Sequence, residues 1–97
     1  MKKRARLIIK DRLEFQDGAF AEVRLWEVPE SKDKPHGYKY SLVYIEKGKR
    51  ILGYDNAEGK GDHRHYGGKE EAYSFKDLDS LKEDFFKAIN KIRRGDR

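Results

Sequence analysis

The sequence contains no cysteine, only two prolines, and no apolar run that approaches the length of a membrane span. Without cysteine, the chain has no disulfide framework, no zinc ribbon and no thiol nucleophile. A membrane-spanning helix needs about 20 mostly apolar residues, whereas 42% of the residues here are charged. The basic start is followed by only three apolar residues, Leu7 to Ile9, which is too short for a signal peptide. We therefore expect a cytoplasmic protein that does not contact a membrane.

The chain is also short, and its 97 residues predict one domain, residues 1–97, with a thin core. Its 23 Lys and Arg residues exceed its 18 Asp and Glu residues by five, and this excess suits a phosphate-rich partner such as RNA. Acidic and basic residues are mixed through most of the chain, however, so a solvated, highly charged surface explains the composition equally well. Charge alone leaves both interpretations open.

Alternation of apolar and polar residues predicts an antiparallel meander in the first half of the chain. A period of two is typical of half-buried strands, and glycine-containing turns separate some of the successive stretches. The predicted strands cover residues 6–16, 19–28, 38–46 and 50–54. The tyrosines of the third stretch, including Tyr38 and Tyr40, share one face, which is more typical of core packing than of a ligand platform.

The last part of the chain predicts a single amphipathic helix over residues 77–94. Its apolar residues recur at spacings of three and four, so they form one stripe along the helix. Asp77 suits the N-cap, and Gly95 suits the stop after the last turn. The predicted fold class is therefore α+β, an antiparallel β-meander of four to five strands covered by one C-terminal amphipathic helix.

Residues 55–76 have weak periodicity and carry most of the residue types that suit chemistry. A structureless connection of this length is uncommon in a compact domain. The segment holds two of the three histidines, His63 and His65, among glycines that let the backbone approach a ligand closely. Three interpretations compete for this segment.

The first interpretation is a metal site, because His63 and His65 would face the same way on a strand. Asp55 or Asp62 could add an oxygen ligand, but zinc normally takes four ligands and only the two histidines are good candidates. The second interpretation is a short fifth strand over residues 63–66 whose polar side chains are merely solvated.

The third interpretation is a centre that cleaves or contacts RNA without a metal ion. Such cleavage needs a base for the 2′-hydroxyl proton, an acid for the leaving oxygen and cations for the phosphorane. His63 and His65 suit the two proton roles, in either order, and Lys60 and Arg64 suit the charge. Tyrosines suit contacts with RNA, since unpaired bases stack on aromatic rings.

The two most distinctive blocks of the sequence lie in and beside this segment. They are Gly53-Tyr54-Asp55-Asn56 and Gly59-Lys60-Gly61-Asp62-His63-Arg64-His65, and Tyr73-Ser74-Phe75 follows them before the helix. Through these blocks, and over nearly the whole chain, the sequence resembles the TumE family of toxin subunits from prokaryotic type II toxin–antitoxin systems. The resemblance implies a small cytoplasmic toxin that is inhibited by a cognate antitoxin, which usually carries a DNA-binding domain.

Together the residues and the resemblance favour a toxin that is a metal-independent endoribonuclease, with RNA and the antitoxin as partners and no cofactor. Its expected catalytic residues are His63, His65, Lys60, Arg64 and Asp62, and its expected substrate-binding residues are Tyr54, Asp55, Asn56, Tyr66, Tyr38 and Tyr40. Asp62 or Asp55 would orient a histidine. The alternative is a non-enzymatic nucleic-acid or protein-binding module. A phosphotransferase is a third candidate, although no strand-to-helix phosphate-binding pattern surrounds Lys60.

Overall fold

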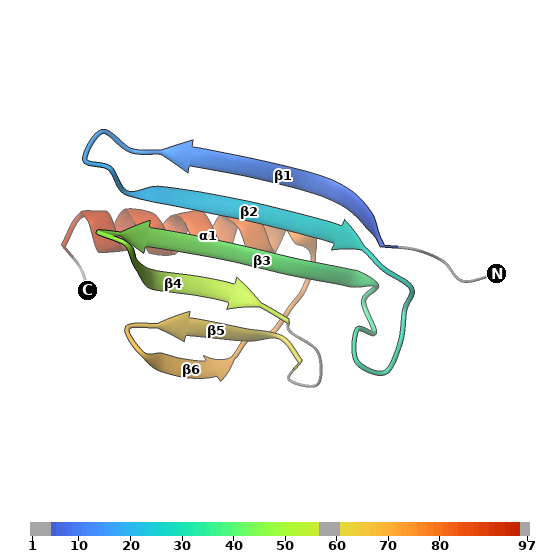
Figure 1. Ribbon diagram of the computed structural model, residues 1–97. Coiled ribbons are helices and arrows are strands. Elements are labelled where there is room, and N and C mark those ends of the chain that lie inside the picture. The colour runs from blue at the N-terminus through green and yellow to red at the C-terminus, as the bar shows by residue number, and fades with distance from the viewer. Residues whose placement is uncertain (1–4, 57–60, 96–97) are drawn as a thin grey trace.

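The computed structural model describes residues 5–56 and 61–95. In this part of the chain six strands form one antiparallel sheet in the order β1-β2-β3-β4-β5-β6, and one helix follows them (Figure 1). The strands are β1 (Arg6–Glu14), β2 (Phe20–Glu27), β3 (Tyr38–Glu46), β4 (Lys49–Asp55), β5 (His63–Tyr66) and β6 (Lys69–Ala72), and the helix is α1 (Leu78–Arg93). The expected α+β meander with a C-terminal helix is confirmed, with one strand more than the sequence indicated.

β6 is the strand that the sequence did not indicate. Its four residues, Lys69–Ala72, do not alternate in polarity, and all four are exposed. It forms a hairpin with β5 across Gly67 and Gly68, whose φ angles of 56° and 88° are ones that glycine adopts without strain. The segment of weak periodicity therefore contains a polar β-hairpin. Its last strand lies at the edge of the sheet and buries no apolar face, so its sequence shows no alternation.

The core lies between α1 and one face of the sheet, as the alternation of the strands and the stripe of the helix predicted. Leu25, Leu42 and Leu52, from β2, β3 and β4, are fully buried together with Leu81 and Phe85 from α1. Figure 1 shows α1 behind the strands, and no other described element lies on the opposite face. Because successive side chains of a strand point to opposite faces, each strand has a helix-covered side and an uncovered side.

β1 adds little to this core. Eight of its nine residues are exposed, and only Ile9 is half-buried. The exposed large hydrophobic residues Leu7, Ile8 and Leu13 all lie on this strand. The thin core expected from the length of the chain is thus concentrated under β2, β3 and β4.

α1 begins at the predicted cap. The Asp77 carboxylate accepts a hydrogen bond from the backbone N–H of Ser80 at 2.7 Å. Asp79 in the first turn and Lys91 and Arg93 in the last turn complement the helix dipole. The described part of the chain contains no helix that is long and apolar enough to cross a membrane.

The C-terminal end of α1 is tied to the sheet through Arg93. Its guanidinium lies 3.9 Å from the ring centre of Phe15 and donates to the Tyr44 hydroxyl at 2.8 Å. It also pairs with the Asp17 carboxylate at 3.1 Å. This one side chain therefore joins the helix to the β1–β2 turn and to β3.

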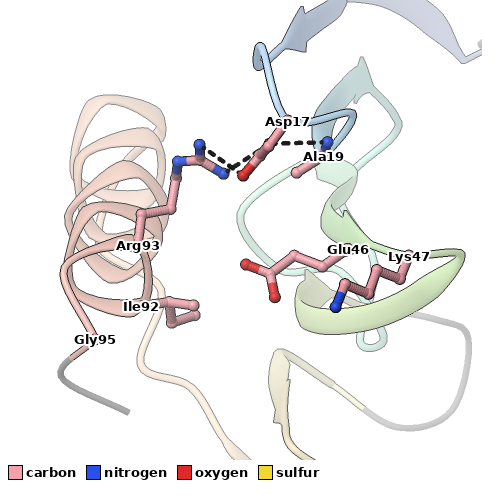
Figure 2. A pocket seen from close by; sticks show the side chains of 7 residues that line it. All are labelled: Asp17, Ala19, Glu46, Lys47, Ile92, Arg93 and Gly95. Carbon is pink, nitrogen blue, oxygen red and sulfur yellow. Dashed lines mark hydrogen bonds and ion pairs between the residues drawn. The ribbon is translucent and has the colours of Figure 1, made fainter.

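A pocket of about 390 Å³ lies beside this contact, between the last turn of α1 and two turns of the sheet (Figure 2). It is lined by Asp17, Ala19, Glu46, Lys47, Ile92, Arg93 and Gly95. Because β4 starts next to the β3–β4 turn and runs away from it, Asp55 at the end of β4 lies at the other end of the sheet. The pocket is therefore separate from the residues that the sequence indicated as functional.

The Asp17 contact makes the stability of the fold depend on pH. Hydrogen bonds from the Ala19 backbone and from Arg93 hold the pKa of the Asp17 carboxyl below its ordinary value of 3.8. A carboxyl whose pKa is lower in the folded protein than in the unfolded chain stabilises the folded state. This stabilisation is fully present above pH 3.8, and it is lost as the pH falls through the pKa of the folded state.

We predict that Asp17→Asn lowers the urea midpoint of unfolding at about pH 6, and that the difference from the wild type disappears towards about pH 2. A gap that stays the same at both pH values would contradict this account.

Candidate active site

The pairing of β4 with β5 brings Asp55, His63 and His65 together. Asp55 lies opposite His63 in the ladder, and Gly53 lies opposite His65. Residues that are opposite each other on paired strands point to the same face, and here that face is the reverse of the one that buries Tyr54. The three side chains therefore lie on the uncovered face of the sheet, where β4 ends and β5 begins (Figure 1).

Both histidine rings direct one nitrogen at the Asp55 carboxylate. His63 Nε2 lies 2.7 Å from Oδ1 of Asp55, and His65 Nε2 lies 3.8 Å from Oδ2. The other nitrogen of each ring faces a different acceptor. His63 Nδ1 donates to the carbonyl oxygen of Gly61 at 3.0 Å, and His65 Nδ1 lies 3.6 Å from the Glu70 carboxylate. Close contacts on both sides thus set the orientation of the His63 ring, whereas the His65 ring lies between two carboxylates at longer distances.

Both nitrogens of the His63 ring face an oxygen atom. Nδ1 donates to the Gly61 carbonyl, and Nε2 lies within hydrogen-bond distance of the Asp55 carboxylate. Since the proton on Nδ1 is used for the carbonyl, a second proton lies between Nε2 and Oδ1, and His63 and Asp55 form one hydrogen-bonded pair. The side chain of His63 is 5% exposed, compared with 18% for His65 and 25% for Asp55. A ligand on the uncovered face therefore reaches His65 and Asp55 first.

Arg50 is a cation on this face that the sequence did not indicate. A Cβ atom at Gly53 would lie 3.2 Å from Cδ of Arg50 and 3.7 Å from its Nε. The Arg50 side chain therefore lies across the backbone of Gly53, in the space that the missing side chain leaves. Since Gly53 is the ladder partner of His65, this places the exposed Arg50 beside the histidine. Its place on this face follows from the irregularity in the β3–β4 ladder, where Ile45 pairs with Arg50 while Tyr44 pairs with Leu52, and no spacing in the sequence reveals it.

Arg64 lies on the helix-covered face, because it stands between the two histidines in β5. Its guanidinium lies 5.8 Å and 5.4 Å from the ring centres of Tyr54 and Tyr66, and it pairs with Glu71 at 3.5 Å. Its Nε atom is buried and has no hydrogen-bond partner among the described residues. The structure thus separates Arg64 from the histidines that it was expected to assist. Lys60, the other expected cation, lies outside the described residues.

Asp62 belongs to a second cluster, around Tyr40. It accepts hydrogen bonds from Nε2 of His36 at 3.0 Å and from the Tyr40 hydroxyl at 2.9 Å. Nδ1 of His36 accepts from the backbone N–H of Tyr38 at 3.2 Å, which leaves the ring proton on Nε2. The His36 ring centre lies 4.0 Å from that of Phe75. Each of the two aspartates therefore orients a histidine: Asp55 contacts His63, and Asp62 contacts His36, a residue distant in sequence.

The tyrosines expected to bind substrate lie on the helix-covered side of the sheet. Tyr40 and Tyr54 are only 2% and 3% exposed, and Tyr38 and Tyr66 are half-buried. Burial raises the pKa of the Tyr40 and Tyr54 hydroxyls above the ordinary value of 10.0. The buried rings of Tyr40 and Tyr54 offer little surface on which a base could stack, whereas those of Tyr38 and Tyr66 are partly accessible.

An aromatic ring that does lie on the uncovered face is that of Trp26. The ladders that join Arg24 to Ser41 and Ser41 to Asp55 place these three residues on one face. Trp26 and Lys39 are opposite each other two residues further along β2 and β3, so they share this face. Nζ of Lys39 lies 5.5 Å from the Trp26 ring centre. The uncovered face thus combines basic side chains, a half-buried indole and the Asp55 cluster.

A family model for toxins matches residues 1–93 of this chain. The protein is therefore a toxin of a toxin–antitoxin system, and an antitoxin is its partner. The matching model is described as Toxin TumE, and the chain belongs to this family. No curated protein and no solved structure matches the chain. These comparisons assign no role to an individual residue of the chain.

Asn56 extends the β3–β4 ladder beyond the last residue of β4. Its Oδ1 accepts from the backbone N–H of Tyr40 at 3.0 Å, and its Nδ2 donates to the carbonyl of Tyr38 at 2.8 Å. The residue is 2% exposed, so its amide is fully engaged inside the protein. Its position next to Asp55 is therefore structural.

We predict that Asn56→Ala lowers the free energy of unfolding by about 2–6 kcal/mol, because two backbone groups lose their partners at about 1–3 kcal/mol each. The matched control is Asn90→Ala, since Asn90 is exposed on α1. Its effect should stay within about 0.5 kcal/mol. Urea denaturation of both variants measures the difference, and equal losses would show that the ladder does not depend on Asn56.

Proposed function

We propose that this toxin is a cytoplasmic endoribonuclease that cleaves cellular RNA without a metal ion. The observation that carries the proposal is the convergence of two imidazole rings on one carboxylate, on a face that also bears an exposed guanidinium. Attack by the 2′-hydroxyl of RNA on the adjacent phosphorus needs a base, an acid and a cation. The uncovered face offers a candidate for each.

His65 is the proposed base. In the proposed tautomer the proton lies on Nδ1, which is directed at the Glu70 carboxylate at 3.6 Å, and the lone pair lies on Nε2, 3.8 Å from the Asp55 carboxylate. This Nε2 takes the proton of the 2′-hydroxyl as the 2′-oxygen forms its bond to phosphorus. At 18% exposure the His65 side chain is accessible from the uncovered face.

The proposed acid is the pair formed by His63 and Asp55. Nε2 of His63 and Oδ1 of Asp55 lie 2.7 Å apart, and one proton lies between them. As the bond from phosphorus to the 5′-oxygen breaks, this proton passes through the Asp55 carboxyl to the leaving oxygen. The products are a 2′,3′-cyclic phosphate and a 5′-hydroxyl. His63 acts behind Asp55 as a positioning residue and proton source, which fits its burial.

Arg50 is the proposed cation for the negative charge of the phosphorane. It takes the role that the sequence suggested for Arg64, whose guanidinium lies on the other face. Lys60 remains a second proposed cation. Lys39 and Trp26 suit contacts with the RNA backbone and with an unpaired base, respectively.

The proposed partner is an antitoxin that carries a DNA-binding domain and blocks this face. Arg24, Lys39 and Arg50 lie on it, so a segment rich in carboxylates would complement its charge. A segment that folds on binding can cover such an extended surface. The antitoxin and RNA would then compete for the same cations.

We predict that His65→Ala and Asp55→Asn each lower the rate of RNA cleavage by purified protein by about 100- to 10,000-fold, the range for loss of a proton-transfer group. Induced wild-type protein should arrest growth and degrade cellular RNA, and both variants should lose these effects. The matched control is His36→Gln, which replaces the remaining histidine, lies in the Asp62 cluster and retains a donor for it. Circular dichroism confirms that each variant is folded.

Growth arrest that persists in both variants while RNA stays intact would overturn the catalytic assignment. It would favour the alternative, a nucleic-acid-binding module, which the basic residues of the uncovered face also suit. Binding of that kind weakens steeply with salt and leaves RNA uncut.

We predict that Arg50→Ala lowers kcat/KM for RNA by about 100-fold, as expected when a group that stabilises the transition-state charge is removed. The matched control is Lys49→Ala, which removes a neighbouring exposed cation at the β3–β4 turn. A steady-state assay with a fluorescent RNA compares the two variants. Equal losses would mean that Arg50 contributes only to the general charge of the protein.

A further inference from the structure

The contacts around Asp55 also suit a divalent transition-metal ion. We propose that Asp55, His63 and His65 form a zinc-binding site, and that zinc bound there inhibits RNA cleavage. The inhibition rests on the proposed function, whereas the binding site does not.

The donor atoms are already gathered for such an ion. One carboxylate oxygen of Asp55 and one nitrogen from each of His63 and His65 lie within 4.8 Å of one another. Tetrahedral zinc with bonds of about 2.0–2.1 Å holds its ligands about 3.3 Å apart, so shifts of about 1.5 Å or less close the site. Two histidines and a carboxylate, with a fourth position open, are a common zinc ligand set in proteins.

The second observation is the contact that each histidine makes through Nδ1, the ring nitrogen that faces away from Asp55. A metal-binding histidine generally donates its other N–H to a carbonyl or a carboxylate, which fixes the ring and leaves the second nitrogen for the ion. His63 Nδ1 donates to the Gly61 carbonyl at 3.0 Å, and His65 Nδ1 lies 3.6 Å from the Glu70 carboxylate. Both rings therefore present Nε2 toward Asp55. The hydrogen bond to Gly61 holds the His63 ring, and the Glu70 carboxylate lies on the corresponding side of the His65 ring.

The backbone holds the donors in place before an ion arrives. Asp55 and His63 are direct partners in the β4–β5 ladder, and His65 is two residues further along β5 on the same face. His63 is nearly buried, whereas Asp55 and His65 are partly exposed. An ion therefore enters from the uncovered face and displaces the proton that His63 shares with Asp55.

Bound zinc would remove both proton roles of the proposed mechanism. Nε2 of His65 would donate its lone pair to the metal and could not accept the 2′-hydroxyl proton. The proton between His63 and Asp55 would pass to solvent, so none would remain there for the leaving 5′-oxygen. RNA would still meet Arg50 and Lys39, so cleavage should be lost while RNA binding persists.

Calorimetric titration of the purified full chain with zinc chloride tests the site. We expect the wild type to bind one ion, and His65→Ala and Asp55→Ala to bind at least about 100-fold more weakly. Glu70→Gln should bind about 10-fold more weakly, since a residue that orients a ligand costs about 10- to 100-fold. The matched control, His36→Gln, removes the third histidine of the chain and none of the donors, so it should bind as the wild type does.

No binding by the wild type, or equal affinity in all variants, would overturn the site. RNA cleavage with and without zinc tests the inhibition: loss of cleavage that a chelator reverses supports it. Cleavage that zinc leaves unchanged, or cleavage that requires zinc, would overturn the inhibition while the titration stands. A protein that cleaves no RNA under any condition would refute the proposed function and the inhibition, and the titration would still decide the metal site.

Discussion

The hydrogen bond between His63 and Asp55 is the contact on which the arrangement of the site depends. It joins the last residue of β4 to the first residue of β5 at 2.7 Å, and it gives a polar partner to a histidine that is 5% exposed. A buried polar group without a partner is costly, so the carboxylate and the Gly61 carbonyl together keep the His63 ring in place. Because His63 holds Asp55, that carboxylate also lies within 3.8 Å of the more exposed His65.

A second constraint is that the short segment around β5 serves both faces of the sheet. Asp62 contacts His36 and Tyr40 and thereby anchors the start of β5 to the aromatic core. The next residue, His63, points to the uncovered face, and Arg64 returns to the tyrosines below α1. A chain of 97 residues with a thin core thus uses one strand both to close its core and to present its polar site.

The sequence predicted the fold well because alternation and helical spacing are local signals. It missed β6, whose four exposed residues carry no such signal. The separation of Arg64 from the histidines was implicit in the predicted strand, since neighbours along a strand point to opposite faces. The choice between Asp55 and Asp62 as the partner of His63 depended on the β4–β5 register. Arg50 reaches the uncovered face through the irregularity in the β3–β4 ladder, and His36 arrives through tertiary packing. None of these three could be read from spacing alone.

We propose that Asp55, His63 and His65 transfer the protons of RNA cleavage without a metal ion. This proton transfer is best tested by the chemical ends of the RNA products, obtained with purified protein in the presence of EDTA. We expect cleavage under these conditions, with a 2′,3′-cyclic phosphate on one fragment and a 5′-hydroxyl on the other. Cleavage that stops in EDTA, or that leaves a 5′-phosphate, would contradict it.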